Sequence, residues 1–518
     1  MTSLGPPLSF DTGEMDKGLP EEVVGFGLPV GEFLRLGQRA LALAAEHVSG
    51  IRDRPVYRRL TEDRRALLMD QPLPDDGASP DAILSFIADH VLTHPMGNGH
   101  PRFFGWVNSP PAHLAILSEL LATAMNPSCA GGDHAAIYLE RCAVRWLMDL
   151  IGFPTSGSMG LLLSGGSTAT IVGLAAARHS VAGADGWNVR EHGLQSGHPR
   201  LVLYVSADGH TCIRKAAEIL GLGADHVRVV PTDGEYRLDL GALAAVVAKD
   251  RVAGLRPFCV AASAGTIGTG AIDPLDAIAD FCAAQALWLH VDGAYGAVGI
   301  LDPAVAPYYT GLERAQSVAL DPHKWLSVPV ECGCVLVRDG ELLRDAFSLV
   351  PSYVRTDPGK GIGGLPWYAE YGLQQTRGFR ALKVWVTLMA VGRRGMAAHV
   401  IRHNRLARRL AAAVDHAPDL ELLAPVALSI VCFRFVPLDW RASEADLDAL
   451  NKAIMEAIQE EGEAFLTGAV LKGRFALRAC VLHYATTEDD VAFLVALVRR
   501  VGARLARAGT RPAAQPPG

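Results

Sequence analysis

The amino-acid sequence predicts an α/β protein in which a large, mostly parallel sheet is followed by a smaller α+β domain. Through the middle of the chain, short apolar segments of strand character alternate with helical patterns, as a doubly wound sheet requires. Glycine-rich or polar residues directly follow five of these segments, which is where open α/β sheets bind ligands. From about residue 395 the pattern changes to a basic helix, two alternating strands and two further helices. These three features together indicate two sheet-containing domains.

The composition indicates a large globular protein that binds neither nucleic acid nor a membrane. The chain has 518 residues, of which 50% are hydrophobic and 20% are charged, and its net charge is -7. This length suits two or three domains, and the negative charge disfavours polyanionic partners. No uncharged apolar run reaches the roughly 18 residues that a spanning helix needs, and the first residues lack the features of a signal peptide. Nine cysteines without CxxC spacing are expected to be reduced thiols, so we expect a cytoplasmic protein.

Four regions are expected along the chain. Residues 1–95 should form an arm and helices that pack on a partner subunit, and residues 96–390 should form the large α/β domain. Residues 391–508 should form the small α+β domain, and residues 509–518 a disordered tail rich in proline and alanine.

The spacing of apolar residues also predicts individual elements. Helices are expected at about 112–125 and 134–151. Asp273 should cap a helix that begins at Pro274, and Thr487 should form a capping box with Asp490. The expected strands are 161–163, 201–205, 259–262, 287–291, 318–320 and 334–337 in the large domain, with 429–435 and 475–482 in the small one.

Lys324 is the most informative single residue. It follows the strand at 318–320 and the pair Asp321-Pro322, and a proline cannot continue a central strand because it has no N–H to donate. Lys324 should therefore lie on a turn just past the carboxyl end of a strand, with His323 beside it to bind an anion and Trp325 as an apolar wall. A lysine held in this way is a candidate for a lowered pKa and for a Schiff base with a carbonyl cofactor. A surface lysine after a turn is the alternative on this stretch alone.

The other strand ends carry groups of complementary chemistry. A helix opens at Gly166 and Ser167, where exposed N–H groups favour a phosphate, although such a turn is often only structural. His210 follows a glycine turn, where a capping role is the more common one, and Thr266 offers a hydroxyl. Asp292 ends a strand, and a carboxylate there must be solvated or paired with a cation.

Pyridoxal 5'-phosphate is the cofactor that needs this whole set. Its aldehyde needs Lys324, its phosphate needs the helix start, and its pyridine nitrogen needs the carboxylate of Asp292 to stay protonated. His210 should stack on one face of the ring, and the small side chain of Ala294 should lie against the other. No metal site is expected.

The segments His290–Tyr295 and Asp321–Trp325 resemble the group II pyridoxal-phosphate-dependent amino acid decarboxylases, which include the aromatic-L-amino-acid and glutamate decarboxylases. The resemblance covers about residues 90 to 500. It implies the type I fold of pyridoxal-phosphate-dependent transferases, similar to aspartate aminotransferase, and a homodimer whose subunits share the active sites. It also implies that the cofactor is covalently bound to Lys324. The cofactor contacts implied by matching positions are Gly166, Ser167, His210, Thr266, Asp292, Ala294, His323 and Lys324.

Two positions depart from the family pattern. The animal aromatic decarboxylases have asparagine where Asp321 stands, so a second carboxylate lies near the expected phosphate. The second threonine of their Gly-Thr-Thr turn is Ile267 here, which leaves Thr266 as the only hydroxyl of that turn.

The glycine-rich stretch 359–368 bears on the reaction. A surface loop is one interpretation. In the family this stretch is a lid over the partner's site, and the resemblance implies that Tyr368 is its catalytic tyrosine, acting with Lys324, Asp292 and His210. Relatives with phenylalanine at this position are similar to oxidative aldehyde synthases. We therefore expect plain decarboxylation to an amine and carbon dioxide, through an external aldimine and a quinonoid.

The substrate side chain is expected to be aromatic. In the family, the segment after His100-Pro101 lines the substrate pocket, and here it is aromatic and apolar, with Trp106 and Ser109 as the expected contacts. Arg102 leaves open an acidic substrate such as glutamate, aspartate or cysteine sulfinate. An aminotransferase is the other alternative, and it would need Arg474 or Arg478 to bind the α-carboxylate.

Overall fold

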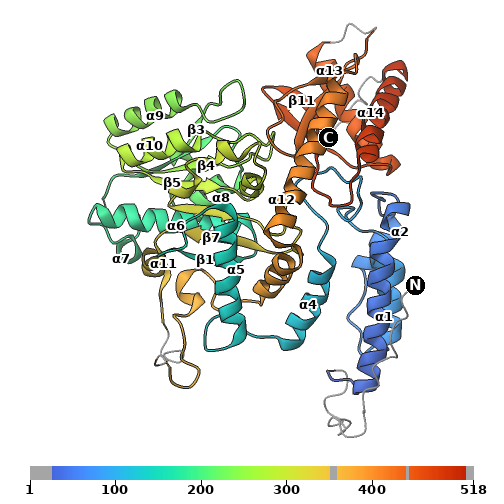
Figure 1. The fold of residues 1–518 in the computed structure, drawn as a ribbon, viewed down its shortest axis with the longest axis horizontal. Helices are drawn as coiled ribbons and strands as arrows, with labels where there is room; N and C mark the ends of the chain where they lie inside the picture. The colour runs from blue at the N-terminus through green and yellow to red at the C-terminus, as the bar shows by residue number, and fades with distance from the viewer. Residues whose placement is uncertain (1–25, 196, 351–356, 358, 439–442, 509–518) are drawn as a thin grey trace.

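The computed structural model describes residues 26–195, 197–350, 357, 359–438 and 443–508. The expected disordered tail at 509–518 and the first 25 residues of the expected arm lie outside the described residues. Two sheets, each with its own set of helices, make up most of the described chain (Figure 1).

The large sheet has seven strands in the order β1-β7-β6-β5-β4-β2-β3. All neighbouring pairs are parallel except those of β7, which runs antiparallel to β1 and β6. Every residue of β1, β2 and β6 is buried, because helices cover both faces of the sheet. The strands are β1 (Met159–Leu163), β2 (Leu201–Ser206), β3 (Val227–Val230), β4 (Arg256–Ser263), β5 (Trp288–Asp292), β6 (Ser317–Leu320) and β7 (Gly333–Val337).

All six strands predicted for this sheet are confirmed, and β3 was not predicted. β3 is a short edge strand with one buried residue, so its sequence carries little of the apolar signal that marks the others.

Helices α6, α8 and α11 pack on one face of this sheet, and α5, α9, α10 and the first half of α12 pack on the other. The helices of this region are α4 (His113–Met125), α5 (Ala135–Ile151), α6 (Gly166–Ala184), α7 (Val189–His192), α8 (Cys212–Ile219), α9 (Leu240–Val252), α10 (Leu275–Gln285), α11 (Gly340–Phe347) and α12 (Arg380–Asp415). The helices predicted at 112–125 and 134–151 are confirmed as α4 and α5.

The small sheet is antiparallel, with the strand order β10-β11-β9-β8. Helix α12 joins the two sheets: it bends at Gly392, where φ is +68°, and its second half packs with α13 and α14 on the small sheet. The bend lies next to the expected domain boundary at 390, which stays a prediction. The elements are β8 (Leu420–Leu422), β9 (Ile430–Phe435), β10 (Thr467–Leu471), β11 (Arg474–Cys480), α13 (Glu444–Glu461) and α14 (Glu488–Ala508).

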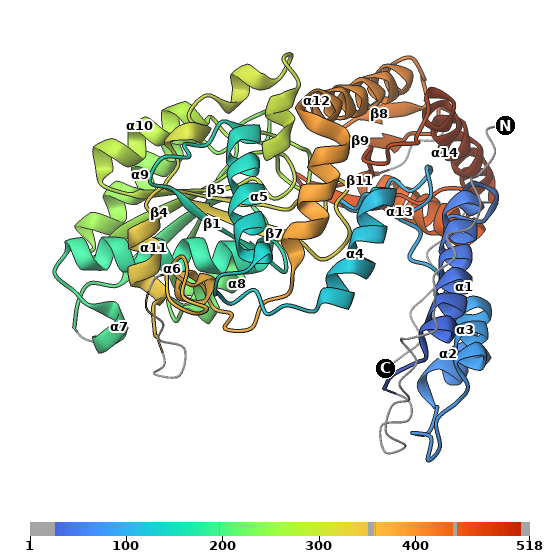
Figure 2. The ribbon, with the colours of Figure 1, turned by 60° about the horizontal axis from the view of Figure 1, so that its bottom comes forward.

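The first three helices project from the rest of the chain (Figure 2). They are α1 (Val30–Ser49), α2 (Glu62–Met69) and α3 (Pro80–Phe86), and Leu36 is the only one of their residues that is buried. No helix in the described part of the chain is long and apolar enough to cross a membrane.

One predicted helix cap is confirmed and one is wrong. The backbone N–H of Thr487 donates to Asp490 at 2.9 Å, and Asp490 N–H donates back to the Thr487 hydroxyl at 3.2 Å. Asp273, by contrast, is buried and accepts the N–H groups of Leu238 and Ser263, both at 2.7 Å. It joins the end of β4 to the loop before α9, and α10 begins one residue later than predicted, with Pro274 at the N-cap and no side-chain cap.

Candidate active site

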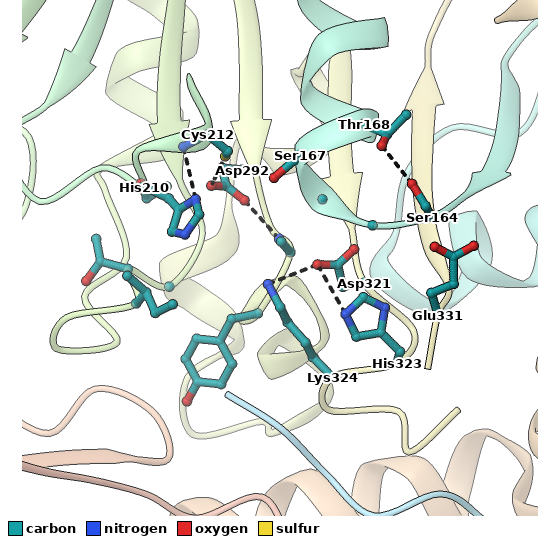
Figure 3. A pocket seen from close by; sticks show the side chains of 18 residues that line it. Ser164, Ser167, Thr168, His210, Cys212, Asp292, Asp321, His323, Lys324 and Glu331 are labelled. Atoms are coloured by element: carbon teal, nitrogen blue, oxygen red, sulfur yellow. Dashed lines mark hydrogen bonds and ion pairs between the residues drawn. The ribbon is translucent and has the colours of Figure 1, made fainter. Parts of the chain in front are cut away.

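Residues from five strand ends meet around one cavity in the large domain (Figure 3). Its volume is about 390 Å³, and its walls come from the start of α6 and from the turns after β2, β4, β5 and β6. Because the carboxyl ends of parallel strands meet at one edge of a sheet, groups far apart in the sequence converge there. All eight residues expected to contact the cofactor line this cavity, namely Gly166, Ser167, His210, Thr266, Asp292, Ala294, His323 and Lys324.

Lys324 lies on the predicted turn after β6. Its backbone N–H donates to the Asp321 carbonyl at 2.9 Å, and its Nζ lies 2.9 Å from Asp321 Oδ2. The predicted lowering of the Lys324 pKa is wrong: burial lowers the pKa, but the nearby carboxylates of Asp321 and Asp292 outweigh burial, so the pKa is raised overall. The lysine is therefore held as an ammonium group at the cavity wall. The sequence indicates Asp321 only as a departure from the family pattern, and the structure shows that it is the ion-pair partner of Lys324.

Buried contacts fix the backbone on either side of this lysine. Trp325 is fully buried, donates from Nε1 to His403 Nδ1 at 3.0 Å, and stacks on Tyr295 at a centroid distance of 5.1 Å. The Ser109 hydroxyl donates to the Lys324 carbonyl. The Ser109 hydroxyl is buried and bound to the backbone of the lysine turn, and its expected contact with the substrate stays a prediction.

Asp292 stands at the last position of β5, facing the cavity from the neighbouring strand (Figure 3). Its Oδ1 accepts the backbone N–H of Ala294 at 3.1 Å, and its Oδ2 lies 4.0 Å from Cys212 Sγ. A backbone hydrogen bond thus holds Oδ1, whereas the contact of Oδ2 with the Cys212 thiol is long and weak. Oδ2 is therefore available to accept a hydrogen bond from a protonated ring nitrogen.

His210 is oriented by the chain just after it. Its Nδ1 accepts the backbone N–H of Cys212 at 3.1 Å. Burial lowers the pKa of His210, which favours the neutral ring. A neutral imidazole held at the cavity edge can stack on a ring and can exchange a proton.

The start of α6 supplies an anion site. No side chain caps this helix, so the first N–H groups are not bound by a capping side chain. A side chain at Gly166 would place its Cβ 2.9 Å from Asp321 Oδ2 and 3.1 Å from Ala294 Cβ, so only glycine lets the helix start approach so closely. Ser167 follows in the first turn, where the helix dipole favours a negative charge.

These residues fit pyridoxal 5'-phosphate. The uncapped helix start suits the phosphate, Lys324 suits the aldehyde and Asp292 suits the pyridine nitrogen. Asp321 Oδ1 is buried and has no hydrogen-bond partner among the described residues, so the cavity has an unused polar position beside the lysine. His323 turns its Nε2 toward Asp321 Oδ2 at 3.8 Å, which places the imidazole next to the same helix start.

Tyr368 does not line the cavity of its own chain. Its ring is 1% exposed and lies under the guanidinium of Arg377, 4.7 Å from the ring centroid, with Arg141 at 5.1 Å. Its hydroxyl has no hydrogen-bond partner among the described residues, and burial raises its pKa far above the ordinary value. Its expected role in a partner's site stays a prediction.

Trp106 also lies outside the cavity wall. Its side chain is 46% exposed, and its ring packs near Phe465 and Phe103, at centroid distances of 5.3 Å and 5.9 Å. Its role as a substrate contact stays a prediction.

Three arginines differ in what holds them. Arg102 donates from Nε to Asp490 at 3.0 Å and packs over the Phe493 ring, and Arg474 pairs with Glu421 at 3.1 Å. Arg478 donates to the carbonyl oxygens of Ile267 at 2.7 Å and of Trp106 at 2.9 Å, and its Nη2 is buried without a described partner. Because Ile267 lines the cavity, Arg478 is the arginine with a free donor near it. In the sequence, the only indication of a role for Arg478 is its position on the predicted strand 475–482 of the small domain.

Comparisons with known proteins agree with this geometry. The model of the pyridoxal-dependent decarboxylase conserved domain matches residues 62–436. The chain is 31% identical to the aromatic-L-amino-acid decarboxylase of Bacillus atrophaeus, covering 89% of this chain and 93% of the relative. It is 34% identical to the L-2,4-diaminobutyrate decarboxylase of Rhizobium meliloti (strain 1021), covering 82% and 83%. The solved structure of Oryza sativa TDC with PLP and tryptamine superposes with a TM-score of 0.86 at 27% identity, covering 92% of this chain and 99% of that one.

Proposed function

The chain belongs to the pyridoxal-dependent decarboxylase family, and from that premise we propose that it converts an aromatic L-amino acid to its amine and carbon dioxide. The protein is a pyridoxal-phosphate-dependent amino acid decarboxylase, a carboxy-lyase of the type I fold. The observation that carries the proposal is the convergence of Lys324 and Asp292 on one cavity beside an uncapped helix start.

Each part of the cofactor has a group in this chain that would hold it. Lys324 would hold the aldehyde carbon, and Gly166 and Ser167 would hold the phosphate, with His323 and Thr266 at its edge. His210 and Ala294 would lie on the two faces of the ring. Once bound, the cofactor supplies an electron sink for the bond that is broken at the α-carbon.

The protein groups control protons and orientation. Asp292 would keep a proton on the pyridine nitrogen, where a fixed negative charge stabilises the charge that develops in the transition state. Lys324 must release its proton before it can bind the aldehyde, and Asp321 is the acceptor next to it, 2.9 Å away. The buried and unpartnered Nη2 of Arg478 supports a role in orienting the substrate carboxylate. The neutral ring of His210 would help to exchange the proton at the α-carbon.

Two observations support an aromatic substrate over an acidic one. Arg102, the cation that an acidic side chain would use, is bound to Asp490 and packs on Phe493. The chain is also 31% identical to the aromatic-L-amino-acid decarboxylase of Bacillus atrophaeus. The 34% identical diaminobutyrate decarboxylase makes a diamino acid the other substrate to include in the test.

The same proposal includes a homodimer with shared sites. Helix α4 packs inward with small residues, Ala115, Ser118 and Ala122, and exposes its large ones, Leu114, Leu117, Leu120, Leu121 and Met125. An exposed apolar helix face of this kind suits a second copy of the chain. Tyr368 lies outside its own cavity and is buried under Arg377, so it would have to leave this position to act in the partner's cavity.

Mixed dimers test the shared site. Lys324→Ala and Tyr368→Phe chains are each expected to form no amine, but a heterodimer would have one site with both an intact lysine and a partner's tyrosine. Random pairing of equal amounts should then restore about a quarter of the wild-type activity. No recovery of amine formation in verified heterodimers would place both groups in one chain's site, and full amine formation by Tyr368→Phe alone would exclude the tyrosine.

A cytoplasmic location is also part of the proposal. All nine cysteines are free thiols in the structure, and eight of them are buried, as suits a reducing compartment. Fractionation of cells that express the tagged protein would test this.

The substrate is tested by carbon dioxide release from cofactor-loaded enzyme. The panel is phenylalanine, tyrosine, tryptophan, dihydroxyphenylalanine, histidine, glutamate, aspartate, cysteine sulfinate and 2,4-diaminobutyrate. We expect the aromatic amino acids to have the highest kcat/KM. Release only from the acidic amino acids or the diamino acid would keep the reaction and overturn the proposed substrate. Transfer of the amino group to a keto acid without carbon dioxide would contradict decarboxylation.

A further inference from the structure

A second cavity lies at the far end of helix α6, and the reaction described above does not use it. Its volume is about 580 Å³, within the range of small-molecule sites. It is lined by residues near the end of α6, from α7, from the start of β2 and from the turn after α8. Both α6 and α8 begin at the catalytic cavity, and Arg178 lies 12 positions after Gly166, roughly 18 Å along the helix. The two cavities are therefore separate, and α7 lies on the side of the molecule away from α1 and α4 (Figures 1 and 2).

The charges on the wall of this cavity all have one sign. Two arginines, Arg178 and Arg200, and two histidines, His192 and His226, line it, and no acidic residue is among the described residues of its wall, although Glu191 Oε2 lies 4.0 Å from His192 Nε2 beside it. Both guanidinium groups carry a full positive charge at neutral pH. The electrostatic potential inside the cavity therefore favours an anion.

Arg178 has no counter-charge. It is half-buried on α6, and its one hydrogen bond in the described chain runs from Nη1 to the Leu220 carbonyl at 2.7 Å. Its Nε is shielded from solvent without a partner, and no described carboxylate lies within ion-pair distance of its guanidinium. Burial lowers the pKa of Arg178, which is the direction expected for a cation that lacks a partner. Since shielded charges are normally paired, the missing partner is an anion.

Apart from Gln195, the other side chains of the wall are apolar. Trp187, Leu201 and Leu222 are buried beside the arginines and form its floor, and Leu194 and Leu220 complete it. The indole Nε1 of Trp187 already donates to the Gly193 carbonyl at 3.1 Å, and one face of the ring stacks on His198 at a centroid distance of 4.6 Å, so the part of the ring that lines the cavity offers only an apolar surface. A ligand that fills the cavity must therefore combine an anionic head with an apolar body.

We propose that this cavity is a binding site for a small organic anion, with a carboxylate or phosphate group held by Arg178 and Arg200 and an apolar body against Trp187, Leu220 and Leu222. The free Nε and Nη2 of Arg178 give the anion two donors on one planar group. The inference does not depend on which amino acid the catalytic cavity accepts.

Calorimetric titration of the cofactor-loaded enzyme tests the site with benzoate, phenyl phosphate, inorganic phosphate and the neutral benzamide. We expect saturable binding of the aromatic anions and none of benzamide, and the tighter of benzoate and phenyl phosphate identifies the head group. Arg178→Met should weaken binding by about ten- to a hundredfold, because a charged hydrogen-bonded partner is lost. Arg200→Gln should weaken it less, since that side chain is exposed.

The matched control is Arg214→Met. Arg214 lies on α8 but pairs with Glu218 at 2.8 Å and does not line the cavity. The Arg214→Met variant should bind benzoate as the wild type does. All three variants, Arg178→Met, Arg200→Gln and Arg214→Met, should keep the wild-type rate of carbon dioxide release. Lys324→Ala should also keep the site, which separates this inference from the reaction. Equal binding by wild type and Arg178→Met, equal binding of benzamide, or no saturable binding by the wild type would each overturn the proposal.

Discussion

Two cavities lie at the two ends of helix α6, and they differ in how their cations are balanced. At the start of the helix, Lys324 Nζ lies 2.9 Å from Asp321, and Asp292 also faces the cavity. Near its end, Arg178 and Arg200 line the larger cavity with no described acid on its wall. The first cavity has its counter-charge within the chain, and the second does not. The two cavities thus differ in charge balance more than in volume: Lys324 is paired within the chain, whereas Arg178 needs a ligand as its counter-ion.

The largest effect is expected at the balanced cavity, from removal of its cation. Lys324→Ala should lower the rate of carbon dioxide release by at least about a thousandfold, because the covalent attachment of the cofactor is lost. Single-turnover and steady-state assays measure this, and Lys452→Ala, on the exposed face of α13, is the control. More than a tenth of the wild-type rate in Lys324→Ala would show that another group does the chemistry.

A smaller loss is expected when the carboxylate opposite is neutralised. Asp292→Asn keeps the shape of the side chain but removes the charge that holds the ring proton, so kcat should fall by about a hundred- to a thousandfold. Asp276→Asn, a surface carboxylate that pairs with Arg314, should leave kcat unchanged. Normal kcat in Asp292→Asn would mean that the pyridine nitrogen does not rely on this carboxylate.

The comparison itself is tested by removing one cation from each cavity in the cofactor-free protein. Lys324→Met leaves Asp321, which is 3% exposed, without its partner and should cost about 3 kcal/mol of unfolding free energy. Arg178→Met removes a cation that has no partner and should cost less than about 1 kcal/mol, roughly its one hydrogen bond. Denaturant titrations measure both. Equal costs would contradict the difference in charge balance between the cavities.

The smallest effect concerns the pH at which the lysine reacts. Burial lowers the pKa of Lys324, but Asp321 and Asp292 raise it overall, and only the neutral amine binds the cofactor aldehyde. Capture of pyridoxal phosphate by the wild type should therefore become faster as the pH rises toward that raised pKa. Asp321→Asn removes one carboxylate, lowers the pKa and should move the same rise to lower pH. Stopped-flow absorbance of the cofactor gives the profile, and coincident profiles would exclude Asp321 as the cause.

Local sequence signals were sufficient for much of the catalytic cavity. The apolar run before Asp321-Pro322 placed Lys324 past a strand end, and the run before Asp292 did the same for the carboxylate, as β6 and β5 show. The glycine at 166 marked the helix start, where a Cβ would lie 2.9 Å from Asp321 Oδ2. Each of these signals depends on a few neighbouring residues.

Contacts between distant residues were not predictable in this way. The pairing of Asp321 with Lys324 needed the turn geometry, and the position of Tyr368 depends on Arg377 and Arg141, which come from other parts of the fold. The proline after Asp273 predicts that this aspartate caps α10, but its carboxylate oxygens accept the backbone N–H groups of Leu238 and Ser263. That Arg178 has no ion-pair partner among the described residues is known only from the side chains that surround it in the structure.

The most direct test of the account is the balance of products formed by the loaded wild-type enzyme from its best substrate. We predict one amine for each carbon dioxide, with no oxygen consumed and no aldehyde formed, as plain decarboxylation requires. Equal amounts of aldehyde and carbon dioxide, with oxygen consumption, would contradict the account and make the protein an oxidative aldehyde synthase despite Tyr368.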